Sequence, residues 1–546
     1  MFVPDTREWV RTDLAVADGV IAGWGPREAA EVVDVDGASL TPGFFDAHMH
    51  LESTKLWVDE FVRTVLPLGT TAVAADPHEL ANVFGVPGVA ALAEAARQLP
   101  FTFAIYASSC VPASRFESPG AELGHAALVQ LIEQHDAIGV AEMMDFPGVI
   151  AGDPEVLAKI AAAGARRVDG HAPGVRSHQL DAYLAAGVES DHECVELEEA
   201  EEKRRKGMWL FVREGSASRN LAALVPTVVR HGTEHVALCT DDREPHTLLE
   251  EGHMNDCVRL AVAAGVPLED ALVLATSRPA EYHRLDHLGH LGPGYQADVL
   301  CFDDLGTLQP AKVFRRGRLV AEGGQIVPGA VAPTPAPSWM LASVHLGNLP
   351  QPAAFALSVP SGAKVRSIGV SARSLSTVEL LVDPADAAQD LGRLAVVERH
   401  HGTGRVGLGH VSGFGLLRGA LASTVAHDAH NCVVLGARGP SGPAEMATAV
   451  ARLGELGGGQ VAVLDGRVLA EVPLPVGGLM SDRPAAEVAA RARRLGDVAA
   501  RQLGVSIEEP FMQLSFLALS VIPDLRISDR GLVDVRTFAL TSAVAG

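Results

Sequence analysis

Between residues 43 and 287, apolar and polar positions alternate between two periodicities, one typical of strands and one typical of helices. Short apolar runs typical of buried strands are separated by stretches of helical spacing, such as 90–98, 154–163 and 257–264. The strand-like runs are 44–51, 70–75, 101–107, 137–142, 166–170, 187–190, 208–212 and 235–240. Eight strands joined by crossover helices predict an α/β chain whose central unit, residues 43–287, is a (β/α)8 barrel.

The segments on either side of this barrel share a sequence pattern that predicts short strands separated by turns. Residues 1–42 contain strand-like pieces broken by turn signals, and residues 296–322 have the same pattern. Because these pieces are too few for a separate core, we expect 1–42 and 288–328 to form one small β-sandwich domain. Residues 329–350, rich in proline and alanine, predict a linker to a C-terminal α+β domain at 351–546.

Composition indicates a globular protein and limits the kinds of partner that it can bind. Of the 546 residues 48% are hydrophobic, and 44 basic against 67 acidic residues give a formal charge of −23. This charge repels phosphates and argues against nucleic acid. Six scattered cysteines without a C-x-x-C pair indicate reduced thiols. With no secretory leader and no apolar stretch long enough to span a membrane, we expect a cytoplasmic protein that binds a small molecule.

Polar residues able to bind a metal ion follow the predicted strands. Chemistry in a (β/α)8 barrel lies at the carboxyl ends of the strands. His48 and His50 lie in the closing residues of the first run and, two residues apart on a strand, point the same way. The other strand exits carry Asp76-Pro77-His78-Glu79, Ser108-Ser109, Glu142, His171, His192-Glu193, Arg213-Glu214 and Asp241-Asp242.

Four imidazoles and two carboxylates in this set are enough to hold two metal ions. They are His48, His50, Glu142, His171, His192 and Asp241. A divalent ion lowers the pKa of bound water toward neutrality and so produces a nucleophile. Any one of these histidines alone is as readily a hydrogen-bonded structural residue. Their joint occurrence at the strand ends favours the metal site.

These motifs resemble those of the adenine deaminase family, within the amidohydrolase superfamily. The resemblance is carried by 42–53, 69–71, 75–79, 108–112, 141–148, 169–174, 190–193, 213–216, 239–243 and 426–431. His-x-His is generic to the superfamily. Asp-Pro-His-Glu at 76–79, Glu-Met-Met at 142–144 and Cys-Thr-Asp-Asp at 239–242 are more specific to the family. Phe45 and Met49 depart from the usual pattern without removing a ligand.

The resemblance implies a metal-dependent hydrolase barrel that converts adenine and water to hypoxanthine and ammonia. It also implies that Glu142 bridges the two ions, where many relatives use a carbamylated lysine at the end of the fourth strand. None of the four lysines of this barrel ends that strand. Asp241 would take the proton of the attacking water, and Glu142 would share in the proton transfer.

Six further strand-exit residues are candidates for binding substrate. They are Asp76, His78, Glu79, Arg213, Glu214 and Ser216. The first three orient the base or the proton carriers, and the last three hydrogen bond to the purine edge. For Arg213 and Glu214, an ion pair that holds the loop is an equal alternative.

The mixed nitrogen and oxygen ligands suit manganese, iron or zinc. The resemblance favours two Mn²⁺ or Fe²⁺ ions per chain, with Zn²⁺ as a further option, and a homo-oligomer, a dimer. The sequence by itself leaves the native metal and the oligomeric state open.

Two other functions fit the same barrel. One is hydrolysis of an amide or cyclic amide, and the other is a non-catalytic binding protein, which the loss of metal ligands would indicate; no ligand is lost. Two local motifs are set aside. His50-Leu51-Glu52 lacks the P-C-x-x-C of another class of zinc deaminase. The G-x-G-x-x-G at 402–407 is followed by more glycines and not by a helix.

The segment His427-Asp428-Ala429-His430-Asn431 lies between the apolar stretches 416–425 and 432–435. A hydrogen-bonded turn is the favoured interpretation. The alternative is a loop that leans over the barrel mouth of its own or a partner subunit and closes the adenine pocket against water.

Overall fold

The computed structural model describes residues 1–216, 218–371 and 376–545, so five residues of the expected C-terminal domain lie outside it. Eight consecutive strands occupy the middle of the chain. They are β6 (Phe44–Met49), β7 (Thr70–Ala75), β8 (Thr102–Ile105), β9 (Gly139–Met143), β10 (Arg167–Gly170), β11 (Ser190–Asp191), β12 (Trp209–Arg213) and β13 (Val236–Cys239). β6 to β8, β9 with β10, and β11 to β13 each pair in parallel.

Backbone hydrogen bonds join these three groups into a ring. Ile138 donates to the Ile105 carbonyl at 2.9 Å, and Glu189 donates to Val168 at 3.0 Å. Asp241 donates to the His48 carbonyl at 3.0 Å and so returns the last strand to the first. Seven of the eight strands begin and end within two residues of the predicted runs. The sixth begins later, at Ser190, because Gly187 (φ 103°) belongs to the turn that ends the preceding helix.

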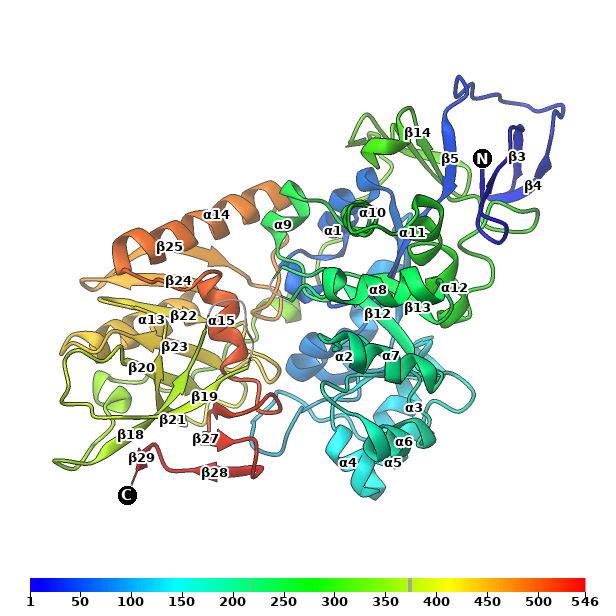
Figure 1. Ribbon diagram of the computed structural model, residues 1–546. Helices are drawn as coiled ribbons and strands as arrows, with labels where there is room; N and C mark the ends of the chain where they lie inside the picture. The colour runs from blue at the N-terminus through cyan, green and yellow to red at the C-terminus, as the bar shows by residue number, and fades with distance from the viewer. Residues whose placement is uncertain (217, 372–375, 546) are drawn as a thin grey trace.

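Helices alternate with the strands around this ring (Figure 1). They are α1 (Val58–Val65), α2 (His78–Ala96), α3 (His125–Gln134), α4 (Phe146–Ala151), α5 (Pro154–Ala161), α6 (Ser177–Ala185), α7 (Leu197–Arg205), α8 (Leu221–His231), α9 (Pro245–Glu250), α10 (Met254–Ala263), α11 (Leu268–Leu274) and α12 (Ser277–His283). β6 and β7 are buried along their whole length, which explains why apolar residues dominate them apart from the buried polar residues Asp46 and His48 of β6 and two threonines of β7. The predicted α/β class with an additional C-terminal domain is confirmed.

The two flanks of the barrel meet in one sheet. β5 (Ser39–Pro42) pairs antiparallel with β14 (Val299–Phe302), which continues into β15 (Lys312–Arg315), β16 (Arg318–Glu322) and β17 (Gln325–Ile326). Two small hairpin sheets precede it: β1 (Phe2–Val3) with β2 (Glu8–Trp9), and β3 (Leu14–Ala17) with β4 (Val20–Trp24). The N-terminal flank is therefore held by strands from beyond the barrel.

The C-terminal part is built on a large mixed sheet in the order β19-β18-β21-β20-β23-β22-β24-β25, with β29 also paired to β18. Its strands are β18 (Lys364–Gly369), β19 (Val378–Val382), β20 (Gly392–Val397), β21 (Val406–Ser412), β22 (Ala420–Ser423), β23 (Cys432–Gly436), β24 (Gly459–Leu464), β25 (Arg467–Pro473) and β29 (Val544–Ala545). A small sheet contains β26 (Leu525–Ser528), β27 (Gly531–Asp534) and β28 (Ala539–Thr541), and the helices are α13 (Gly442–Leu456), α14 (Ala485–Val498) and α15 (Pro510–Phe516). The glycine motif at 402–407 leads into strand β21 and not into a helix, as expected.

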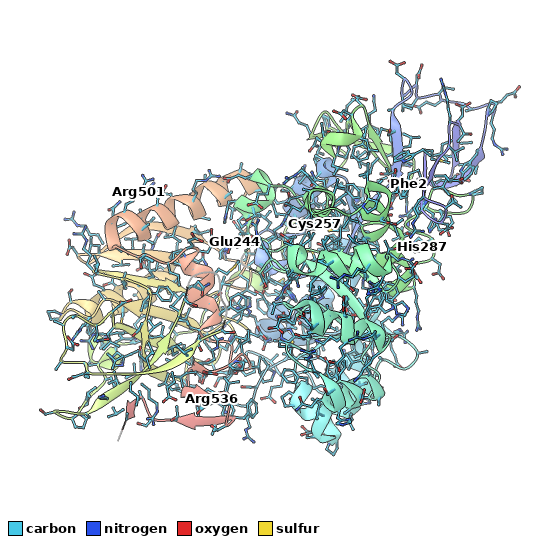
Figure 2. The ribbon with its side chains drawn as sticks, viewed as in Figure 1. Phe2, Glu244, Cys257, His287, Arg501 and Arg536 are labelled. Carbon is cyan, nitrogen blue, oxygen red and sulfur yellow. The ribbon has the colours of Figure 1, made fainter. Side chains whose placement is uncertain are left out.

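The C-terminal domain packs against the side of the barrel where α9 lies (Figure 1). Figure 2 places Glu244, the residue before α9, at this junction. The predicted linker at 329–350 is itself packed: the Trp57 indole donates to the Thr334 carbonyl at 2.8 Å, and Val331 and Met340 are buried. One hydrophobic core continues from Leu56 of the barrel to Leu479 of the C-terminal domain. Among the helices of the described residues, none combines the length and the apolar character needed to cross a membrane.

Candidate metal centre

Six buried side chains gather at the carboxyl ends of the barrel strands. Each has an exposed fraction of 7% or less. They are the six predicted ligands, and we call them the candidate metal centre: His48, His50, Glu142, His171, His192 and Asp241. They lie at the ends of β6, β9, β10, β11 and β13, so five strands bring them together.

Glu142 lies between two groups of imidazoles. Its Oε1 is 3.3 Å from His50 Nε2. Its Oε2 is 2.9 Å from His171 Nδ1 and 3.4 Å from His192 Nε2. Each carboxylate oxygen therefore faces a different group of nitrogen ligands, which is the arrangement that a carboxylate shared by two cations requires.

Asp241 completes the group that contains the His-x-His pair. Its Oδ1 is 3.2 Å from His50 Nε2 and 3.8 Å from His48 Nε2. The Nδ1 atom of His50 lies 2.9 Å from the Asp76 carbonyl, which fixes the ring hydrogen on Nδ1 and leaves Nε2 free to bind an ion. His48 Nε2 is buried without a hydrogen-bond partner among the described residues. An unpartnered buried imidazole nitrogen fits a metal ligand.

The charges of the centre suit cations. Burial alone would raise the pKa of Glu142, but hydrogen bonds from His171 and His78 hold it well below its usual range. Burial likewise opposes ionisation of Asp241, and the Arg213 charge outweighs it, so this pKa is also well below normal. Burial, followed by the His192 charge, lowers the pKa of His48 and keeps it neutral. The carboxylates are therefore ionised at neutral pH.

Some of the imidazoles carry protons that a cation would replace. Burial disfavours the charged form of His192, but hydrogen bonding to Glu193 and the nearby carboxylates raise its pKa to about 9. The pKa of His50 is raised well above normal because Asp241 and Glu142 outweigh the effect of burial. Metal binding at this centre would release these protons.

Arg213 joins the centre through partners that the sequence did not indicate. Its Nη1 donates to Asp241 Oδ2 at 2.6 Å, and its Nη2 donates to Glu193 Oε2 at 2.8 Å. Glu193 Oε1 lies 3.4 Å from His192 Nε2 and 3.6 Å from His171 Nδ1. The alternative prediction, an ion pair between Arg213 and Glu214 that holds the loop, is therefore wrong. Arg213 pairs with Glu193 and Asp241 instead. The only sequence signal for Glu193 was its place directly after His192.

Glu214 and Ser216 are hydrogen bonded within their own region. Glu214 Oε1 accepts from the Leu221 amide at 3.1 Å. Ser216 Oγ accepts from the Glu244 amide at 2.9 Å and lies 2.7 Å from the Thr247 hydroxyl. These bonds hold the loop after β12. They give no support to a contact with substrate, which stays a prediction.

Asp76 and His78, after β7, support the centre from one side. Asp76 Oδ1 accepts from the Ser108 hydroxyl at 2.6 Å, and its Oδ2 is 3.2 Å from His78 Nδ1. The same His78 nitrogen lies 3.3 Å from Glu142 Oε1. Glu79 Oε1 accepts from the Ser53 hydroxyl at 3.1 Å. The Asp76 carbonyl thus orients His50, and His78 orients Glu142. The hydrogen bond of Glu79 runs to Ser53, outside the centre.

The loop at 427–431 forms the hydrogen-bonded turn that was favoured for it and also contacts the barrel. It is a hydrogen-bonded turn, because the His430 amide donates to the Ala426 carbonyl at 2.7 Å and the Ala426 amide donates to His430 Nδ1 at 3.1 Å. It also reaches the barrel of its own subunit: Asp428 Oδ1 is 3.7 Å from His78 Nε2, and His430 Nε2 is 3.4 Å from Glu79 Oε2. Closure of a substrate pocket by this loop stays a prediction.

Comparison with known proteins places the chain in a family along nearly its whole length. Residues 39–320 match the model of the amidohydrolase family, and residues 372–539 match the adenine deaminase C-terminal domain. A protein of Desulfatibacillum aliphaticivorans named adenine deaminase is 43% identical over 543 residues, covering 97% of this chain and 93% of the relative. One of Carboxydothermus hydrogenoformans, named adenine deaminase 2, is 42% identical over 98% of this chain and 94% of the relative. A protein of Nitratidesulfovibrio vulgaris named adenine deaminase is 44% identical, covering 98% of this chain and 93% of the relative.

Proposed function

The chain belongs to the adenine deaminases of the amidohydrolase family, and we propose that it hydrolyses adenine to hypoxanthine and ammonia at the candidate metal centre. The observation that carries this proposal is Glu142, whose two oxygens face separate groups of imidazoles. All six predicted ligands are present and buried, which does not favour a non-catalytic homologue. Relatives named for adenine do not favour an amide as substrate.

We propose that two divalent cations bind here, one with His48, His50 and Asp241 and one with His171 and His192, with Glu142 shared. When bound, such cations supply a strong water-derived nucleophile at neutral pH. Mn²⁺ or Fe²⁺ is proposed, and Zn²⁺ also accepts nitrogen and carboxylate ligands.

The protein groups of the centre have distinct tasks in the reaction. Water adds to C6 of adenine, and the bond between C6 and the exocyclic amino nitrogen breaks. One water proton leaves with that nitrogen as ammonia, and the other ends on the ring nitrogen next to C6. Asp241, ionised and beside the nucleophile, accepts the proton of the attacking water and returns it to the departing amine. Glu142 shares this proton transfer, and Arg213 holds the Asp241 carboxylate at 2.6 Å.

Of the proposed substrate residues, Asp76 and His78 are better supported as positioning residues. Their contacts run to the backbone and side chains of the centre. Arg213 donates hydrogen bonds to Asp241 and Glu193, which supports a positioning role for it as well. Direct contacts of Glu79, Glu214 and Ser216 with the purine remain proposals.

Two broader expectations stay proposals as well. All six cysteines are buried free thiols, which supports a reducing compartment such as the cytoplasm and a role in purine salvage there. A homo-oligomer, a dimer, also remains a proposal.

The function is tested by the ultraviolet spectrum of adenine. Protein stripped with a chelator and reloaded with Mn²⁺ should convert adenine to hypoxanthine, with release of one ammonia for each purine. Cyclic amides offered to the same preparation should not be hydrolysed at a comparable rate. A reloaded protein that holds its metal ions but leaves the adenine spectrum unchanged would contradict the proposal.

A further inference from the structure

A second buried cluster lies where the C-terminal domain contacts the barrel mouth. His78 and Glu79 come from the first turn of α2, and His427 and Asp428 come from the loop before β23. We call these four residues the interdomain cluster. Their exposed fractions are 3%, 0%, 6% and 1%, so the cluster is shielded from solvent.

The four side chains are spaced like ligands around a shared ion. His78 Nε2 is 3.7 Å from Asp428 Oδ1, and the same oxygen is 3.6 Å from His427 Nδ1. His427 Nδ1 is 3.8 Å from Glu79 Oε1. These separations exceed those of normal hydrogen bonds. Two ligand atoms about 2.1 Å from a common ion in tetrahedral geometry lie about 3.4 Å apart, close to the observed spacing.

Unpartnered acceptors give independent evidence for a ligand. Asp428 Oδ2 and Glu79 Oε2 are buried and have no hydrogen-bond partner among the described residues. Glu79 is partnered through its other oxygen, which accepts from Ser53. A buried carboxylate oxygen without a partner is nevertheless costly, and a cation offsets that cost. Burial disfavours the charged imidazoles, but nearby anionic groups raise the pKa of His427 to about 9 and that of His78 well above normal, so an ion bound here would replace their protons.

The hydrogen bonds of the surrounding rings decide which nitrogens are available. His78 Nδ1 faces Asp76 and Glu142, which directs its Nε2 toward the interdomain cluster. His430 Nδ1 accepts from the Ala426 amide, so its neutral ring carries the hydrogen on Nε2, facing Glu79 Oε2 at 3.4 Å. His430 is therefore a neighbour that orients Glu79, and not a ligand.

We propose that His78, Glu79, His427 and Asp428 hold a third divalent cation that joins the C-terminal domain to the barrel mouth. Two nitrogens and two carboxylate oxygens suit zinc, manganese or iron. Possible ligand atoms of His78, Glu79 and His427 all lie within 4.8 Å of one another, a spacing that allows them to share one ion. Because His78 also faces Glu142, this ion would hold His78 in the orientation that supports the candidate metal centre.

The test is the number of metal ions in the full chain. The protein is stripped with a chelator, reloaded separately with Mn²⁺ or Zn²⁺, freed of loose ions by gel filtration and analysed for metal. We expect three ions per native chain and two per chain in Asp428→Asn and in His427→Gln. The matched control is Asp529→Asn, which should keep three.

Asp529 is a suitable control because it is also a buried carboxylate at the domain interface. It accepts from the Ser118 amide at 3.1 Å and from the Ser118 hydroxyl at 2.7 Å. Its replacement therefore weakens the same interface without touching the interdomain cluster. Thermal unfolding adds a second measurement. A chelator concentration that removes one ion should lower the unfolding temperature of the native protein and of Asp529→Asn. It should leave the unfolding temperature of Asp428→Asn unchanged.

The outcomes separate this inference from the proposed function. Two ions in the native chain, or three in folded Asp428→Asn and His427→Gln, would overturn the third site and leave the candidate metal centre intact. Fewer than two ions in the native chain would contradict both. Unchanged metal content with a raised KM for adenine in the two variants would instead place the loop in the substrate pocket and overturn the inference. Should Asp428→Asn fail to fold, His427→Gln decides.

Discussion

Arg213 donates a 2.6 Å hydrogen bond to Asp241, so the proposed proton carrier of this enzyme faces a fixed positive charge. Both groups are buried, and Arg213 is held in place from its other side by Glu193. The pKa of Asp241 is low for this reason, although burial acts in the opposite direction. The ion pair therefore favours the ionised form of the proposed catalytic carboxylate.

Replacing Arg213 should move the pH dependence of the reaction. Arg213→Gln removes the charge that lowers the pKa of Asp241, so the acidic limb of the kcat/KM profile should shift to higher pH. Arg213→Lys keeps the charge and should shift it less. The measurement is the rate of adenine deamination as a function of pH. Arg219→Gln, which removes an exposed arginine paired with Glu251, is the control and should leave the limb in place.

Asp241→Asn should reduce kcat by at least about a hundredfold, as the loss of a proton carrier typically does. The amide keeps a hydrogen-bonding group in place but cannot accept the proton of the attacking water. Steady-state kinetics and metal analysis should be carried out on the same preparation. Near-native turnover together with native metal content would remove Asp241 from its proposed role.

His48→Ala and His171→Ala should each abolish activity and reduce the metal content while the fold persists. Both side chains lie at the strand ends, above the apolar core of the barrel, so their removal deprives a cation of a ligand without opening that core. Metal analysis and far-ultraviolet circular dichroism test this prediction. His178→Ala removes a fully exposed imidazole on α6 and should change neither quantity. Retention of full metal content in His48→Ala or His171→Ala would exclude that residue as a ligand.

His283 should make the fold sensitive to acid. It is buried between the Tyr106 hydroxyl, 2.5 Å from its Nδ1, and the Ala47 carbonyl, 2.9 Å from its Nε2. Burial, with a smaller effect of the Arg167 charge, lowers its pKa from 6.5 to about 3. The unfolded chain therefore takes up a proton near pH 6.5 that the folded chain refuses until about pH 3.

The free energy of unfolding should accordingly decrease as the pH falls through this range, by a contribution of about 5 kcal/mol. His283→Gln can still donate to Ala47 but cannot take up the proton, so urea unfolding of this variant should depend less steeply on pH between 4 and 7. His231→Gln, on the surface, should keep the native slope. Equal slopes for native protein and His283→Gln would contradict the prediction.

The sequence by itself determined the strands of the barrel and the residues that gather in the candidate metal centre. A strand buried on both faces is dominated by apolar residues, so β6 could be recognised by the apolar run that opens it and β7 by its run of small and β-branched residues. His48, Glu142 and Asp241 could be recognised because each directly follows or ends such a run, and the barrel topology sends all these ends to one face.

Tertiary structure alone decided which charged groups are paired and what covers the barrel mouth. Arg213 pairs with Glu193 and not with its neighbour Glu214, because the parallel strands β11 and β12 lie side by side and their exits meet in space. Asp428 reaches His78 across 350 residues of chain, and the proline-rich linker is packed against α1. No local pattern encodes such contacts, because they depend on how whole domains pack together, whereas strand periodicity and metal-binding motifs depend on residues adjacent in the chain.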